Sequence, residues 1–224
     1  TETESLRVTD TGQTWGGIKT VTLQRNNFSD FVTWDTNRSL THTFMASTVP
    51  SGEVSGWVVL ERQWSPYTLD APLVLQSAST MSIQDGVSLR ASEGVTITVN
   101  GVFDAGAATI SSTGYGARWG GLMLGPSVAA SIELSGTQLL ESAPALTVSG
   151  LGSVRADGVF MARSSSDPLV LVESGNAAEL VVRNSHLQNG SGCAHLYPSS
   201  ATIAFTNVSF ADCEEQGVWA QQVP

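Results

Sequence analysis

The chain has 224 residues, of which 41% are hydrophobic and only 13% charged, and its formal net charge is −10. A chain of this length can bury the core of one domain or of one long repetitive rod. We exclude a nucleic-acid partner, because phosphate binding needs clustered Lys and Arg, whereas this chain has one lysine and scattered arginines.

The same composition bears on secondary structure and on membranes. The 22 glycines, the many Ser, Thr, Val and Ala, and the single Lys19 favour strands and turns over helices. No apolar run reaches the ~20 residues that a membrane-spanning helix needs. Thr1 is not followed by a basic and apolar leader, so we expect any signal peptide to have been removed or omitted, and no membrane span in this segment.

Residues 1–71 have irregular spacing and hold four of the six tryptophans, namely Trp15, Trp34, Trp57 and Trp64. Trp15-Gly16-Gly17-Ile18 is similar to Trp119-Gly120-Gly121-Leu122 further along the chain. We predict an N-terminal cap with one or two irregular coils over 1–71, because an open sheet end invites aggregation. Residues 72–224 are predicted to form the regular part of what is one continuous domain.

The last 94 residues contain four segments that superimpose without gaps over their first half, with a period of 22 to 26 residues. They are SIELSGTQLLES from Ser131, SVRADGVFMARS from Ser153, ELVVRNSHLQNG from Glu179 and TIAFTNVSFADC from Thr202. Repetition at this period indicates a solenoid, in which each unit buries its apolar face against its neighbours.

Each unit begins with alternating apolar residues, which is typical of a strand with one buried face. A residue that accepts a left-handed backbone follows at the bend, in order Gly136, Gly158, Asn184 and Asn207. A second strand is marked by Leu139, Met161, Leu187 and Phe210, and a third strand comes after a loop of variable length. We therefore predict that Ile132, Val154, Leu180 and Ile203 form one interior column.

Three strands per coil, with no helical period, predict an all-β fold, a right-handed parallel β-helix. The motifs in 86–89, 95–106 and 119–122 carry a resemblance to the pectate-lyase-like superfamily, and more closely to the β-helical segments of secreted or surface-anchored microbial proteins. The resemblance covers roughly residues 72–224, and it is specific for architecture much more than for function.

Enzymes of that superfamily need clustered acids with a basic residue, or neighbouring aspartates with a Gly-His-Gly motif, and neither set is evident here. The other repeats carry Ser135, Arg183 and Thr206 at the position of Asp157. Asp157 is thus the only acid at this position, and we expect an ordinary solvated face there. No serine lies in a nucleophile elbow of the G-x-S-x-G kind, so His42, His186 and His195 are expected at the surface or in turns. We predict no catalytic residues, no metal site and no cofactor.

Aromatic residues and sequons give the remaining candidate sites. Trp57, Trp64 and Tyr67 form either a ligand-contact patch for sugars or a plug at the end of the rod, and the plug is favoured. N-glycosylation is predicted at Asn27, Asn37 and Asn189, all in sequons. Asn207 also lies in a sequon, but we expect it to stay unmodified inside a hydrogen-bonded ladder with Asn184.

Cys193 and Cys213 are too few for a structural zinc site without a matching histidine pair. Alignment of the last two coils through Ala194 and Val218 places them close enough to bond. We predict a disulfide between them and, with it, an oxidising compartment.

No specific activity follows from the sequence. The favoured function is a non-catalytic extracellular or cell-surface module for adhesion, glycan contact or structural support, with surface glycans or neighbouring surface proteins as partners. The first alternative is a polysaccharide-active lyase or hydrolase, which requires two acids and an Arg or Lys converging in one groove. The second is a self-assembling filament or coat subunit, which requires uncapped coil ends. The ligand, the organism and the oligomeric state stay open.

Overall fold

The computed structural model of the chain describes residues 8–10, 19–23, 40–42, 49, 51–114, 116–164, 167–173, 178–197, 200–214 and 217–221. Within these ranges, β1 (Val8–Asp10), β2 (Lys19–Leu23) and β3 (Leu40–His42) pair antiparallel in the order β1-β2-β3. Trp15 and Trp34 lie outside the described residues.

From Gly52 onward the described strands form three parallel sheets of seven, seven and eight strands. Sheet 1 contains β5 (Trp57–Leu60), β8 (Thr80–Ile83), β11 (Val102–Ala105), β14 (Ser131–Ser135), β17 (Ser153–Asp157), β20 (Glu179–Arg183) and β23 (Thr202–Thr206). Sheet 2 contains β6 (Tyr67–Leu69), β9 (Ser88–Ala91), β12 (Thr109–Ser112), β15 (Gln138–Leu140), β18 (Phe160–Ser164), β21 (His186–Gly190) and β24 (Ser209–Ala211). Sheet 3 contains β4 (Gly52–Val54), β7 (Leu73–Leu75), β10 (Thr96–Val99), β13 (Gly121–Leu124), β16 (Leu146–Val148), β19 (Val170–Val172), β22 (Ala194–Leu196) and β25 (Val218–Ala220).

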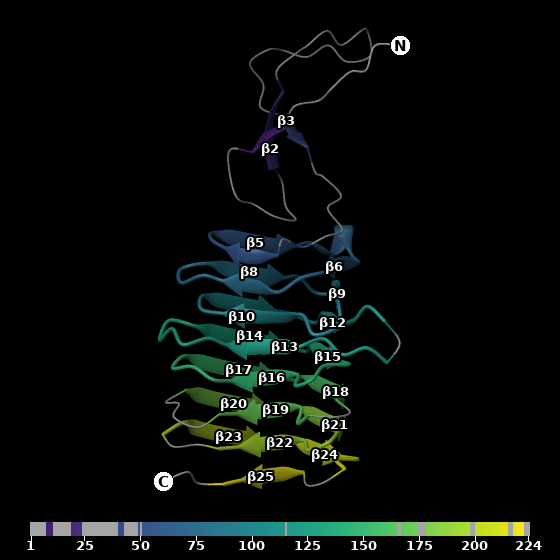
Figure 1. Cartoon of the computed structure of the whole chain (residues 1–224), viewed down its shortest axis with the longest axis vertical. Coiled ribbons are helices and arrows are strands. Elements are labelled where there is room, and N and C mark those ends of the chain that lie inside the picture. Colours follow the sequence, from purple (N-terminus) through teal and green to yellow (C-terminus); the bar gives the residue numbers. More distant parts are fainter. Residues whose placement is uncertain are drawn as a thin grey trace.

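Strands that follow one another along the chain belong to different sheets, and equivalent strands of neighbouring coils pair side by side. The chain therefore winds as a parallel β-helix of about seven turns, with the coils stacked along the long axis (Figure 1). The 3₁₀ segment η1 (Arg62–Trp64) is the only helical element in the described part. The all-β parallel β-helix predicted from the sequence is confirmed.

The predicted register is confirmed to the residue. Ile132 pairs with Val154, Val154 with Leu180, and Leu180 with Ile203. The first three are completely buried, so the alternating apolar positions of each repeat fill one interior column. The second strands align in the same way, with Leu139, Met161, Leu187 and Phe210 in neighbouring positions.

The predicted bend between sheets 1 and 2 is also present. Gly136 and Gly158 have φ of 65°, Asn184 has φ of 49° and Asn207 has φ of 53°. Glycine and asparagine adopt this left-handed conformation at the least cost, which explains why only these two residue types fill the bend in the four repeats.

The first parallel coil lies within the range predicted to be the N-terminal region, since β4, β5 and β6 pair with β7, β8 and β9. The division of the chain at residue 72 stays a prediction.

The two ends of the β-helix differ in how well their cores are covered. In the first coil Val54, Val58 and Leu69 are 3% exposed or less. In the last coil Ile203 and Phe205 are only partly buried, and Val218 is 42% exposed. The core is therefore closed at the coil that begins with β4 and open at the coil that ends with β25.

Candidate functional site

The outer face of sheet 1 carries the charged side chains that come closest to a site. In a strand, alternate side chains point to opposite faces, so the residues between the buried ones of β11, β14, β17 and β20 face outward. They include the charged residues Asp104, Glu133, Arg155, Asp157, Glu179 and Arg183. We call this set the charged strip.

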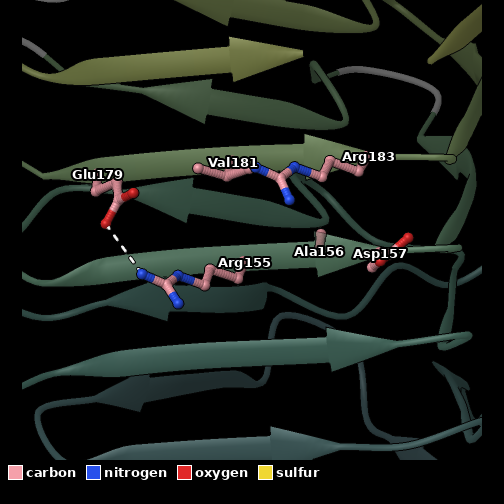
Figure 2. A pocket seen from close by; sticks show the side chains of 6 residues that line it. All are labelled: Arg155, Ala156, Asp157, Glu179, Val181 and Arg183. Atoms are coloured by element: carbon pink, nitrogen blue, oxygen red, sulfur yellow. Dashed lines mark ion pairs between the residues drawn. The ribbon is translucent and has the colours of Figure 1, made fainter. Parts of the chain in front are cut away.

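A cleft of about 300 Å³ opens over β17 and β20 within this strip. Arg155, Ala156, Asp157, Glu179, Val181 and Arg183 line it (Figure 2). An Arg155 guanidinium nitrogen lies 3.5 Å from a Glu179 carboxylate oxygen, and the two side chains are 62% and 45% exposed. Because both side chains are exposed, their ion pair adds little to stability, and both groups remain accessible to a ligand.

Arg183 is the cation of the cleft with the greatest freedom. It lies opposite Asp157 in the register of β17 and β20, but no ion pair involves its side chain within the described residues. In Figure 2 its guanidinium lies over Val181 on the same strand. The cleft thus offers an exposed guanidinium next to a small apolar surface.

Asp157 is held by a different partner. Asn184 donates from Nδ2 to Asp157 Oδ1 at 2.9 Å, and Asn207 donates from Nδ2 to Asn184 Oδ1 at 2.9 Å. This ladder runs along the bends of three successive coils. The expected ladder between Asn184 and Asn207 is present, whereas the glycosylation state of Asn207 stays a prediction.

A pair of acids lies beside the cleft. Asp104 on β11 pairs in register with Glu133 on β14, and Glu133 pairs with Arg155 on β17. Paired strands lie ~4.8 Å apart, and like charges directly opposite each other are destabilising. Two acids and an arginine therefore meet on one face, although only Arg155 of the three lines the cleft.

The aromatic residues predicted as ligand contacts do not share one exposed surface. Trp57 is 66% exposed on β5, whereas Tyr67 is completely buried. Trp64 packs partly buried against the core, and its Nε1 donates to Glu61 Oε2 at 3.2 Å. Trp57 is thus the most exposed of the three rings.

The Tyr67 hydroxyl is hydrogen-bonded to the backbone of Glu61, the residue that directly precedes η1. Its hydroxyl donates to the Glu61 carbonyl oxygen and accepts from the Glu61 N–H, both at 3.0 Å. Burial raises the pKa of Tyr67, and the hydrogen bond with the Glu61 backbone offsets part of that rise. Tyr67 is therefore a buried, hydrogen-bonded residue of the first coil, and the predicted plug at the end of the rod stays a prediction.

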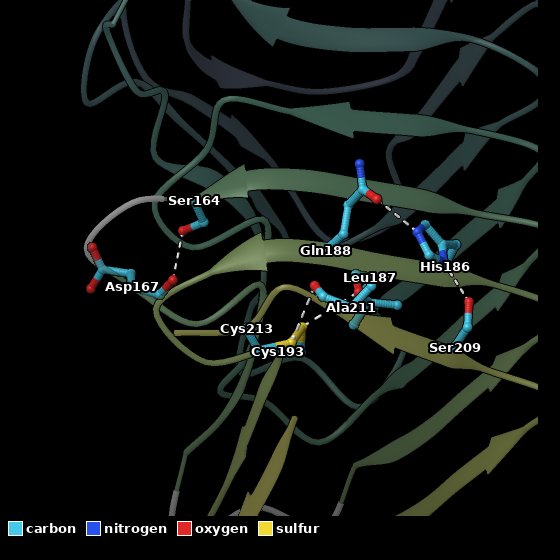
Figure 3. Close-up of a disulfide and its surroundings, with 9 residues drawn as sticks. All are labelled: Ser164, Asp167, His186, Leu187, Gln188, Cys193, Ser209, Ala211 and Cys213. Atoms are coloured by element: carbon cyan, nitrogen blue, oxygen red, sulfur yellow. Dashed lines mark hydrogen bonds between the residues drawn. A yellow bond between two sulfur atoms is a disulfide. The ribbon is translucent and has the colours of Figure 1, made fainter. Parts of the chain in front are cut away.

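Cys193 and Cys213 are joined by a disulfide, with their Cα atoms 5.6 Å apart (Figure 3). The bond links the start of β22 to the loop after β24 in the next coil. Ala194 and Val218 pair in register, which is the alignment from which the sequence predicted the bond.

The remaining histidines and sequons lie on outer surfaces where they are described. His186 on β21 contacts Ser209 and Gln188, and His195 makes an edge contact with the Trp219 ring at 5.6 Å. Asn189 is exposed. Asn27 and Asn37 lie outside the described residues, so their glycosylation stays a prediction.

Sequence reasoning missed a second bend, between sheets 2 and 3. Glu141, Arg163, Asn189 and Asp212 have φ of 57°, 66°, 56° and 51°. Each follows the first bend by five residues in its repeat, but the four residues share no residue type that would have marked a bend in the sequence. Arg163 and Glu141 form an ion pair of 3.2 Å here. Next to it is a smaller cleft of about 250 Å³, lined by Arg118, Arg163, Asn189, Asp212 and Glu214.

Within the described residues, no group of three or more His, Cys, Asp or Glu side chains is placed to hold a metal ion. No helix in the same part of the chain has the length and apolar character for crossing a membrane.

Comparison of the chain with protein-family models, with curated proteins and with solved structures finds no match. The parallel β-helix therefore rests on the structure itself, and the resemblance to the pectate-lyase-like superfamily stays an expectation from the sequence.

Proposed function

We propose that this chain is a non-catalytic β-helix module, outside the cell or at its surface, that contacts glycans through the charged strip of sheet 1. The observation that carries the proposal is the open cleft in which Arg183 has no ion pair within the described residues and lies beside the exposed Arg155–Glu179 pair.

The chemistry of the cleft suits a sugar. A guanidinium offers five N–H donors and a carboxylate offers acceptors, and hydroxyl groups of a saccharide can pair with both. Val181 supplies a small apolar patch between the two arginines for the C–H face of a ring. Solenoids commonly use such extended faces for binding, and a chain-like ligand would run along the strip toward Glu133 and Asp104.

A glycan array followed by calorimetry on the best ligand tests this proposal. Removing a charged hydrogen-bond donor costs about 1.5–3 kcal/mol, so Arg183→Ala should weaken binding at least about tenfold. Gln138→Ala, at an exposed position on sheet 2, is the matched control and should bind like the wild type. Failure of any glycan to bind, or equal affinity of the two variants, would rule the cleft out.

The proposed location draws support from the disulfide. Disulfides persist in oxidising compartments and are rare in the cytosol, and Cys193 and Cys213 are bonded here. Alkylation of intact producing cells with a thiol reagent tests the location. The native protein should show no alkylated cysteine, and modification of both cysteines before lysis would count against it.

A second function, a polysaccharide-active enzyme, is favoured by one observation only. Asp104, Glu133 and Arg155 lie on neighbouring strands in one register column, which brings together two carboxylates of the kind that glycoside hydrolysis needs and a basic group. Incubation with a panel of polysaccharides, with product chains counted by their reducing ends, distinguishes this function from plain binding. An enzyme would lose its activity in Asp104→Asn and in Glu133→Gln, whereas a binding module releases no product in any variant.

A further inference from the structure

A hydrogen-bonded trio lies on sheet 2, away from the charged strip. His186 on β21 contacts the Ser209 hydroxyl through Nδ1 and the Gln188 amide oxygen through Nε2, the latter at 2.8 Å (Figure 3). Ser209 is on β24 and pairs in register with His186, so the contact joins equivalent positions of two neighbouring coils.

The partners of the imidazole determine which nitrogen carries the proton. An amide oxygen can only accept a hydrogen bond, so Nε2 of the neutral ring must be the donor toward Gln188. Nδ1 is then the basic nitrogen, and it accepts the hydrogen bond from the Ser209 hydroxyl. A hydroxyl that donates to a neutral imidazole is the arrangement by which serine becomes a nucleophile.

The ring is also held in place from its face. Phe160 stacks on His186 with ring centroids 5.6 Å apart and an interplanar angle of 5°. Phe160, His186 and Ser209 occupy one register column across β18, β21 and β24. Because Ser209 is exposed, a reagent in solution can reach its oxygen.

We infer that Ser209 is a reactive nucleophile toward acyl esters, with His186 as its general base and Gln188 as a positioning residue. The Ser209 Oγ attacks the ester carbonyl carbon while its proton passes to His186 Nδ1. The carbon–oxygen bond to the alcohol then breaks, and the leaving alcohol takes the proton from Nδ1.

This inference is independent of the glycan proposal, because the trio shares no residue with the cleft of sheet 1. The two can therefore succeed or fail separately.

The test uses p-nitrophenyl acetate and intact-mass measurement of the full chain, made in a host that does not glycosylate it. We expect one acetyl group per chain on the peptide that contains Ser209, and none in Ser209→Ala. General-base assistance contributes about 10²–10⁴-fold, so His186→Phe, which keeps an aromatic ring against Phe160, should acylate at least tenfold more slowly. Ser135, an exposed serine on β14, should stay unmodified in every sample.

The role of Gln188 is tested by two variants. Gln188→Met removes the acceptor and should slow acylation of Ser209, whereas Gln188→Glu keeps an acceptor at the same place and should restore the rate. Circular dichroism and the thermal midpoint verify that each variant is folded. Absence of an adduct on Ser209 in the wild type, or equal acylation rates in wild type and His186→Phe, would overturn the inference.

Discussion

Asn184 combines two functions at a single residue, since it adopts a left-handed backbone and bridges its neighbours above and below. Its φ is 49°, and its side chain both donates to Asp157 and accepts from Asn207. An L-residue with a Cβ pays about 1–2 kcal/mol for this backbone conformation. Asparagine offsets part of that cost through its local hydrogen bonds.

Replacement of Asn184 separates the two contributions. Asn184→Ala should lower the free energy of unfolding by about 2 kcal/mol, because the backbone strain remains and the hydrogen bonds are lost. Asn184→Gly also loses the hydrogen bonds but accepts the positive φ, so its loss should be smaller. Urea unfolding of the two variants measures the difference. If alanine were tolerated as well as glycine, the left-handed backbone would carry no strain at this bend.

Tyr67 should make the first coil less stable as the pH rises in the alkaline range. Burial raises the pKa of its hydroxyl above the ordinary value of 10.0, so the folded chain holds the proton at a pH where the unfolded chain releases it. The free energy of unfolding should therefore be unaffected by this group below pH 10 and should fall as the pH rises through the folded-state pKa. In Tyr67→Phe this part of the decline should be missing. Identical alkaline profiles for wild type and Tyr67→Phe would contradict the assignment.

At the scale of single elements, the disulfide determines how firmly the last coil is attached. The core side chains of β23 and β25 are only partly covered, so burial stabilises this coil less than the others. The bond closes a loop over a sequence separation of 20 residues, which corresponds to about 3 kcal/mol in the chain-entropy account.

Reduction should therefore release the last coil selectively. After treatment with dithiothreitol, the amide protons of β23, β24 and β25 should exchange much faster, while those of β14 and β17 should remain protected. The double variant Cys193→Ser, Cys213→Ser should show the same exchange pattern with or without the reductant. Uniform loss of protection over all coils would instead show that the β-helix unfolds as one unit.

The elements of the β-helix were predictable where the residue type is dictated by geometry. Interior positions must be apolar and the first bend must accept a positive φ, so Ile132 and Gly136 find equivalents in each of the later repeats. The second bend has no such signature, because Glu141 and Arg163 adopt the same φ although they share no side-chain property. Their ion pair at 3.2 Å joins two neighbouring coils, and a single repeat does not display such a contact.

The acid column of the charged strip was missed for a different reason. Val102 pairs with Ser131, 29 residues later, whereas the four later repeats follow one another at 22 to 26 residues. A longer loop therefore separates β11 from β14 and hides the register between Asp104 and Glu133. Surface loops of variable length are tolerated. The register of the strands on either side of such a loop therefore depends on how the whole coil packs, and it cannot be read from the loop's sequence.

At the scale of the whole molecule, the difference between the two ends of the β-helix limits how copies can associate. Head-to-tail stacking into a filament requires exposed core side chains at both ends, so that the apolar interior of one copy continues into the next. The last coil satisfies this requirement, with Val218 42% exposed. The first described coil does not, because the side chains of Val58 and Leu69 are completely buried.

Association of this 224-residue chain should therefore stop at a finite size. Light scattering over a wide range of protein concentration should give a molar mass that levels off at no more than two copies, since only open ends that face each other can join. Val218→Lys places a charge on the open end and should return any such pair to single chains. A molar mass that keeps rising with concentration, or fibres in electron micrographs, would favour the filament function, because the buried first coil would then have to open to receive the last coil of another copy.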